Sequence, residues 1–282
     1  MRWRSLATLG LLAAAAKEEA RAADLPLFVV ERSRVIWPKK CARPATPVPA
    51  ELHSQIRKEM GERGLIVGGG RADEVALGAP ECMPGECGSG QFSVPLVSSE
   101  TERTGLLVPA GKIDPVALRP LKLVSVEGTD PHGLRPGLPA LSPAPPSCGE
   151  PPAESSPRSP AAGLLITCLT YREPGGALGV QIQGRGQLEG NGSPAYEVVR
   201  FRLLDSHTGV PGAWHAQVRG KGSRMPVPVA LVPSGARSEV RVLWLRQEGI
   251  CCPSAASAWW TDVGEHATDG PRRVAGFGQP CD

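Results

Sequence analysis

The residues of this chain with the most evident chemistry are its eight cysteines: Cys41, Cys82, Cys87, Cys148, Cys168, Cys251, Cys252 and Cys281. An even number of cysteines in a chain that begins with an export signal, described below, is typical of structural disulfides. The spacing does not choose the pairing, but the turn-forming residues between Cys82 and Cys87 indicate a small local loop. The chain has no Cys-x-x-Cys motif, so a thioredoxin-like redox site is not predicted. Metal ligation and free buried thiols stay open as alternatives, although no histidine sits beside Cys82 and Cys87 to complete a zinc site.

Catalytic motifs are missing from the sequence. Cys87, in the glycine-rich stretch 85–90, would be a nucleophile if a histidine approached it, but a disulfide is the favoured interpretation. The chain contains no H-E-x-x-H, G-x-S-x-G or S-x-x-K pattern. Each histidine is interpreted as a surface or packing residue, and these are His53, His132, His207, His215 and His266. We therefore predict no catalytic residue, no cofactor-binding residue and no metal ligand.

Two further groups of residues suggest recognition rather than catalysis. Trp259 and Trp260 could stack on a sugar ring or lie against a membrane surface, although packing in a core or an interface is the favoured interpretation. Asn191 begins an Asn-Gly-Ser triplet, which matches an N-glycosylation site. The triplet matters only in a host that glycosylates secreted proteins.

Residues 1–23 are predicted to be a signal peptide. Arg2 and Arg4 precede an eleven-residue apolar run, 6–16, and Ala20-Arg21-Ala22 fits the small-x-small cleavage pattern. The apolar run is too short to serve as a finished membrane anchor. A mitochondrial presequence and an ordinary helical start are the alternatives, and the acidic Glu18 and Glu19 argue against the first. The expected location is secreted or periplasmic, with no membrane span.

Composition limits the partners. The formal net charge is +3, from 31 basic and 28 acidic residues, so no strong field favours nucleic acid or an anionic membrane. Aromatic residues make up only 4% of the chain, while glycine and proline occur 34 and 30 times. A core with few aromatics is expected to need disulfide support. The skewed composition indicates a GC-rich genome, and a reading frame never selected to fold is the alternative.

The region 24–130 is predicted to be a small, irregular α+β region. Residues 25–31 form the first expected strand, residues 35–37 follow, and Pro38 is expected to end that strand. Residues 49–60 carry an apolar stripe, Leu52, Ile56 and Met60, with four-residue spacing that predicts a helix closed by Gly61 and Gly64. Residues 65–67 run into a triple glycine that is interpreted as a turn, because it lacks a phosphate-loop pattern.

Residues 131–163 contain ten prolines in 33 residues and are predicted to be an extended linker. The region 164–282 then alternates apolar and polar residues in short runs separated by turns. Residues 173–176 indicate a hairpin, and 196–204 place Val199 and Phe201 on the opposite face from Arg200 and Arg202. Prolines at 226, 228 and 233 are expected to place residues 227–232 on a sheet edge. The predicted fold class is mainly β: the irregular α+β region followed by a C-terminal antiparallel β-sandwich.

These features predict an exported, disulfide-stabilised protein that binds a partner or has a structural role in the cell envelope or outside the cell. A protein or a glycan is the expected partner, and no cofactor is predicted. A secreted hydrolase with an unrecognised cysteine–histidine site and a weakly selected reading frame are the alternatives. The predicted fold class does not by itself identify a function.

Overall fold

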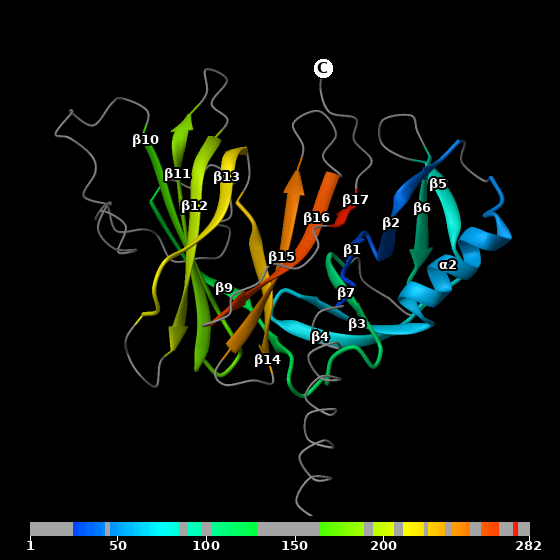
Figure 1. The fold of residues 1–282 in the computed structure, drawn as a ribbon, viewed down its shortest axis with the longest axis horizontal. Helices are drawn as coiled ribbons and strands as arrows, with labels where there is room; N and C mark the ends of the chain where they lie inside the picture. Colours follow the sequence, from blue (N-terminus) through cyan, green and yellow to red (C-terminus); the bar gives the residue numbers. More distant parts are fainter. Residues whose placement is uncertain are drawn as a thin grey trace, which may run out of the picture.

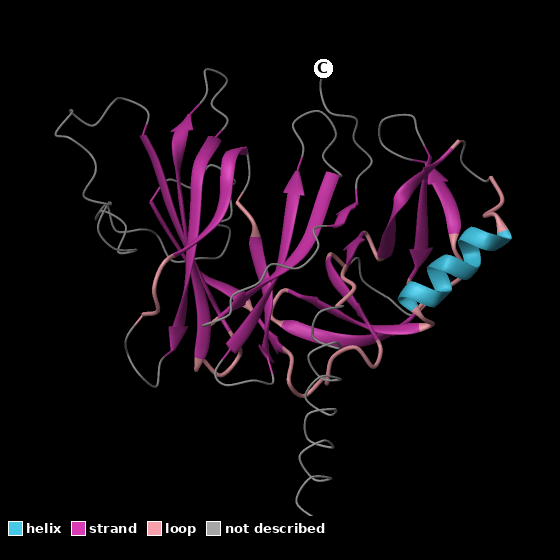
Figure 2. Ribbon diagram, in the orientation of Figure 1, coloured by secondary structure: helices cyan, strands magenta, loops and turns pink. Residues whose placement is uncertain are grey.

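A computed structural model describes residues 25–42, 46–84, 90–97, 103–128, 164–188, 194–205, 211–222, 225–234, 239–248, 255–264 and 273–275. These residues form three antiparallel sheets and one helix, so the chain is mainly β, as the alternating sequence pattern predicted (Figure 2). The predicted signal peptide, 1–23, and the predicted linker, 131–163, lie outside the described residues.

The N-terminal part forms a seven-stranded sheet with the order β4-β3-β7-β1-β2-β6-β5. Its strands are β1 (Phe28–Glu31), β2 (Arg34–Cys41), β3 (Arg63–Gly68), β4 (Arg71–Ala76), β5 (Glu81–Pro84), β6 (Gly90–Pro95) and β7 (Gly105–Pro109). Helix α2 (Ala50–Met60) covers one face of this sheet (Figure 1).

The C-terminal part forms two five-stranded sheets. The outer sheet has the order β13-β12-β11-β10-β9, and the central sheet has the order β17-β16-β15-β14-β8. The outer strands are β9 (Lys122–Gly128), β10 (Leu164–Arg172), β11 (Leu178–Leu188), β12 (Pro194–Asp205) and β13 (His215–Gly222). The central strands are β8 (Arg119–Pro120), β14 (Val227–Ser234), β15 (Glu239–Glu248), β16 (Ala255–Val263) and β17 (Arg273–Ala275).

The central sheet is covered on both faces, because one apolar core lies between it and the seven-stranded sheet and another lies between it and the outer sheet (Figure 1). Successive residues of a strand point to opposite faces, so both of its faces need apolar side chains. Strand β15 meets this need with Val242, Leu243 and Trp244, which are fully buried in succession. A third core lies between helix α2 and the seven-stranded sheet.

Two strands that precede residue 130 pair with strands of the C-terminal half. Strand β9 pairs with β10 in the outer sheet, and β8 pairs with β14 in the central sheet. The C-terminal sandwich therefore includes residues from both sides of the proline-rich segment. The division of the chain into domains at 130 and 163 stays a prediction.

Helix α2 agrees with the pattern that predicted it. Pro49 lies at its N-cap position, and Ile56 and Met60 are buried against the seven-stranded sheet. The helix ends at Gly61, which has a φ of 74° and donates its backbone N–H to the carbonyl of Arg57. Gly64, expected to be a second breaker, instead belongs to β3, where a Cβ would lie 2.7 Å from a side-chain carbon of Leu107.

Two expectations about proline were wrong. Pro38 does not end its strand, because β2 continues to Cys41 through an irregularity in its pairing with β6. Strand β14 is not an edge strand, since β8 pairs beyond it at Ala230 and Leu231. The pairing of β2 with β6 is irregular between Ile36 and Lys40, and the pairing of β14 with β15 is irregular between Pro228 and Ala230. Such interruptions let a strand contain a proline, which lacks the backbone N–H that regular pairing uses.

Candidate functional site

The outer face of the outer sheet carries a group of polar side chains that do not belong to any core. Strand β12 directs Val199 and Phe201 into the core shared with the central sheet. The alternation of the strand therefore directs Arg200 and Arg202 to the opposite face. The sequence analysis had predicted that these two pairs of side chains lie on opposite faces of the strand.

Two buried glutamines hold these arginines. Gln183 lies opposite Arg200 in the β11–β12 register, and Gln181 lies opposite Arg202. The Nε of Arg200 donates to Oε1 of Gln183 at 2.6 Å, and the Nε of Arg202 donates to Oε1 of Gln181 at 2.8 Å. The glutamines are only 3% and 7% exposed, so their amides are fixed and each orients a guanidinium.

Trp214, just before β13, contacts both arginines. The Cζ of Arg200 lies 4.5 Å from the centroid of a Trp214 ring, and that of Arg202 lies 4.6 Å from it. A cation over an indole is attracted by the ring electrons. Nearby, the backbone N–H of Gly212 donates to the carbonyl of Leu203 at 2.9 Å, which ties this segment to β12. We call Arg200, Arg202, Gln181, Gln183 and Trp214 the arginine face.

The arginine face contains two positive charges close together, with that of Arg185 nearby. Burial lowers the pKa of Arg200 from its ordinary value, and the positive charges of Arg185 and Arg202 lower it further. Burial also lowers the pKa of Arg202. Both guanidiniums remain cations at neutral pH because arginine titrates far above it. A set of like charges that is held in place favours an anion over a neutral ligand.

The chemistry available to this face is anion recognition. A guanidinium is planar and presents several N–H donors in a fixed geometry that matches carboxylates and sulfates. Because Nε of each arginine donates to a buried glutamine, the orientation of each guanidinium is fixed before any ligand binds. The sequence showed two arginines on one strand face, but the contribution of Trp214 depends on a loop position that no local pattern reveals.

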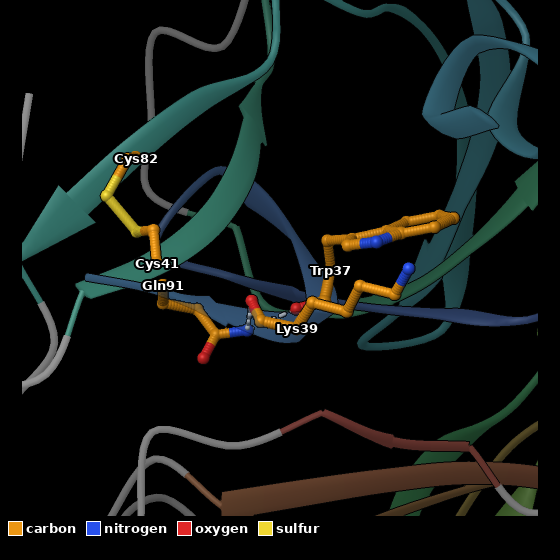
Figure 3. Close-up of a disulfide and its surroundings, with 5 residues drawn as sticks. All are labelled: Trp37, Lys39, Cys41, Cys82 and Gln91. Carbon is orange, nitrogen blue, oxygen red and sulfur yellow. Dashed lines mark hydrogen bonds between the residues drawn. A yellow bond between two sulfur atoms is a disulfide. The ribbon is translucent and has the colours of Figure 1, made fainter. Parts of the chain in front are cut away.

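The disulfide of the seven-stranded sheet joins Cys41 in β2 to Cys82 in β5, with Cα atoms 6.1 Å apart (Figure 3). Strand β6 lies between these strands, so the bond passes over it at Gly90. A Cβ on Gly90 would lie 2.6 Å from Sγ of Cys41 and 2.9 Å from Sγ of Cys82. The expected local loop between Cys82 and Cys87 is wrong, because sheet pairing brings Cys82 to Cys41 instead.

The side-chain amide of Gln91 hydrogen-bonds with the stretch of β2 around Pro38, where β2 does not pair regularly with β6. The side chain is 1% exposed, and its Nε2 donates to the carbonyls of Trp37 and Lys39 (Figure 3). These carbonyls belong to the irregular stretch of β2, between Ile36 and Lys40, that does not pair regularly with β6. A buried carbonyl without a partner is costly, and Gln91 supplies that partner.

Of the remaining cysteines, Cys168 in β10 is disulfide-bonded and 1% exposed, and its partner lies outside the described residues. Five further disulfide candidates lie outside the described residues: Cys87, Cys148, Cys251, Cys252 and Cys281. Among the cysteines that the structure describes, none is free. A disulfide is compatible with an oxidising, extracellular environment.

The other residues considered for function are dispersed. Trp259 and Trp260 are both buried and point to opposite sides of β16, so the packing interpretation is correct. His53 lies on helix α2, and His215 packs against Phe201 with ring centroids 5.4 Å apart. Outside the described residues lie His132, His207, His266 and the triplet beginning at Asn191. Within the described ranges, no three His, Cys, Asp or Glu residues gather as they would to hold a metal ion.

A buried ion pair on the central sheet was missed by the sequence analysis. Nε and Nη2 of Arg241 donate to the two carboxylate oxygens of Asp262, at 2.7 and 2.8 Å. The Cζ of Arg241 also lies 3.5 Å from the centroid of a Trp260 ring. Both charged side chains are less than one-tenth exposed and lie on the face toward the seven-stranded sheet. The pair is structural, because it is enclosed between two sheets.

The part of the chain that the structure describes has no helix with the length and apolar character needed to cross a bilayer. Comparison with known proteins finds no matching family, no matching curated protein and no matching solved structure.

Proposed function

We propose that this protein is exported to an oxidising compartment, where it binds an acidic glycan through the arginine face of its outer sheet. The observation that carries the proposal is the pair of guanidiniums held by Gln181 and Gln183 from β11 and by Trp214 from the loop before β13. Side chains that are already fixed lose little conformational entropy when a ligand binds.

A carboxylated polysaccharide suits this face better than the other partner classes. Arg200 and Arg202 occupy alternate positions of one strand, so their positive charges follow one another along one face of the outer sheet. A linear polymer with repeated carboxylates can meet such donors in succession. The net charge of +3 gives no wide field for nucleic acid, which supports a local and stereochemical form of recognition.

Export is supported by the basic start and apolar run of residues 1–23 and by the Cys41–Cys82 disulfide. Mass spectrometry of the natural protein under non-reducing conditions tests this part. We expect a chain that begins at Ala23 or Asp24 and contains bonded cysteines. An intact chain with every thiol free would overturn it.

Binding is tested with polygalacturonate as the carboxylated probe and dextran as the neutral one. We expect saturable binding to polygalacturonate that weakens as salt is raised, because screening reduces contacts between exposed charges. The double variant R200A/R202A is expected to bind at least tenfold more weakly, since charge-assisted hydrogen bonds contribute about 1.5–3 kcal/mol each.

The matched control is Arg63→Ala. Arg63 is an exposed arginine of β3 whose Nη1 lies 3.7 Å from Glu74, away from the outer sheet. This variant removes one positive charge without touching the arginine face, so its affinity should equal that of the unmodified protein. Equal binding by R200A/R202A with intact folding, or equal binding of dextran and polygalacturonate, would refute the proposal.

A further inference from the structure

Three polar side chains lie in one row across the outer sheet, on the side away from the core. Thr170 of β10 lies opposite Gln181 of β11, and Gln181 lies opposite Arg202 of β12. Residues directly opposite one another on neighbouring strands point to the same face of a sheet. Thr170 therefore lies on the same face as Arg202, two strands away from it.

The side-chain amide of Gln181 has a different partner at each end. Its Oε1 accepts from Nε of Arg202 at 2.8 Å, and its Nε2 donates to Oγ1 of Thr170 at 3.5 Å. A glutamine amide has one oxygen that accepts and one nitrogen that donates. When the oxygen faces Arg202, the nitrogen faces β10, and the Thr170 hydroxyl is the acceptor there.

Burial makes this hydroxyl important. Gln181 is only 7% exposed, so water has little access to its amide. A buried donor that loses its partner costs free energy, and the amide can reduce that cost only by moving. Because Oε1 of the same amide orients Arg202, movement of the amide would also change the orientation of the guanidinium.

The second glutamine of the arginine face provides a comparison on the same strands. Gln183 orients Arg200 and lies opposite Cys168 of β10, which is disulfide-bonded. A disulfide sulfur has no hydroxyl and is only a weak acceptor. Loss of the Thr170 hydroxyl should therefore affect Arg202 and leave Arg200 unchanged.

We propose that Thr170 is a positioning residue of the arginine face. Its hydroxyl holds the Gln181 amide with Oε1 toward Arg202, and this fixes the Arg202 guanidinium for an anionic ligand. The contact between Gln181 and Thr170 is longer than an average hydrogen bond, so we expect an effect of modest size. The ligand part of this inference rests on the proposed binding of an acidic glycan, whereas the orientation of Arg202 is measured without a ligand.

NMR of the isotope-labelled protein, with its disulfides intact and no ligand, measures hydrogen exchange at the Nε–H groups of Arg200 and Arg202. Variants that lack one of the two arginines assign the two signals. Thr170→Val keeps the shape of the side chain and removes the hydroxyl, so exchange at Arg202 should become about threefold faster. Thr170→Ser keeps the hydroxyl and should exchange as the unmodified protein does. Equal exchange at Arg202 in Thr170→Val and the unmodified protein would overturn the proposal.

Thr167→Val is the matched control. Thr167 lies on the same strand but faces the core, where its Oγ1 is 3.2 Å from the hydroxyl of Tyr196. Its loss should lower the melting temperature without changing exchange at Arg202. An equal effect of Thr167→Val, or equally faster exchange at Arg200, would indicate general loosening of the sheet and refute the positioning role. If Thr170→Val does not fold, Thr170→Ala takes its place with the same two outcomes.

Binding of polygalacturonate connects this role to the ligand. Thr170→Val should bind about threefold more weakly, and Thr170→Ser should bind as the unmodified protein does. In an Arg202→Ala background Thr170→Val should have no further effect, because the hydroxyl acts through Arg202. The same threefold loss in that background would refute the inference. Lack of binding by the unmodified protein would refute the glycan proposal, whereas exchange at Arg202 that depends on Thr170 would still support the positioning role.

Discussion

Removing the Asp262 carboxylate should destabilise the protein far more than removing an exposed one. Asp262 and Arg241 are 8% and 7% exposed, and two hydrogen bonds join them. Asp262→Asn keeps the shape of the side chain but removes the negative charge that faces the Arg241 cation between two sheets. Breaking a buried pair in this way costs about 3–5 kcal/mol. Because whole domains are stable by only about 5–15 kcal/mol, the loss is a large fraction of the total.

The chain supplies its own control. Arg63 and Glu74 form an ion pair at 3.7 Å, but their side chains are 71% and 67% exposed. Exposed pairs contribute about 0–1 kcal/mol, so Glu74→Gln should change the free energy of unfolding little. Urea unfolding followed by tryptophan fluorescence measures both variants under the same conditions.

A third variant separates the cost of leaving the Arg241 charge without the Asp262 carboxylate from the contribution of the ion pair itself. R241M/D262L replaces both charges with apolar groups, and such replacements of buried pairs are often neutral or stabilising. We therefore expect the double variant to be more stable than Asp262→Asn alone. If Asp262→Asn costs no more than Glu74→Gln, or if the double variant is the least stable of the three, the burial argument is incorrect.

Two further predictions concern single positions. Gly90→Ala places a methyl group against both disulfide sulfurs, so overpacking should lower the free energy of unfolding by about 1–3 kcal/mol. The loss should be smaller in a C41A/C82A background, where the sulfurs are absent. Thermal melts that show an equal loss in both backgrounds would contradict this explanation. Burial raises the pKa of Tyr171 above its ordinary value of 10.0, so the unfolded chain loses this proton first and stability falls as pH rises above about 10. Tyr171→Phe should flatten that alkaline loss in urea unfolding measured from pH 8 to 11, whereas a slope identical to that of the unmodified protein would count against it.

The sequence by itself determined the local elements and their faces. The spacing of Leu52, Ile56 and Met60 predicted helix α2, and the alternation around Val199 and Phe201 predicted which side of β12 faces the core. The Glu173–Gly176 turn was also visible, and it connects β10 to β11 in the structure. These features depend on periods of a few residues, so a window of sequence contains all the information that they need.

Only the tertiary structure decided the long-range pairs. Cys82 bonds to Cys41 because β6 brings β2 and β5 to either side of Gly90, although Cys87 is far closer in sequence. Trp214 completes the arginine face because its loop is tied to β12 at Leu203. Contacts of this kind depend on which strands become neighbours, and strand order is set by the packing of three sheets rather than by the pattern within any one strand.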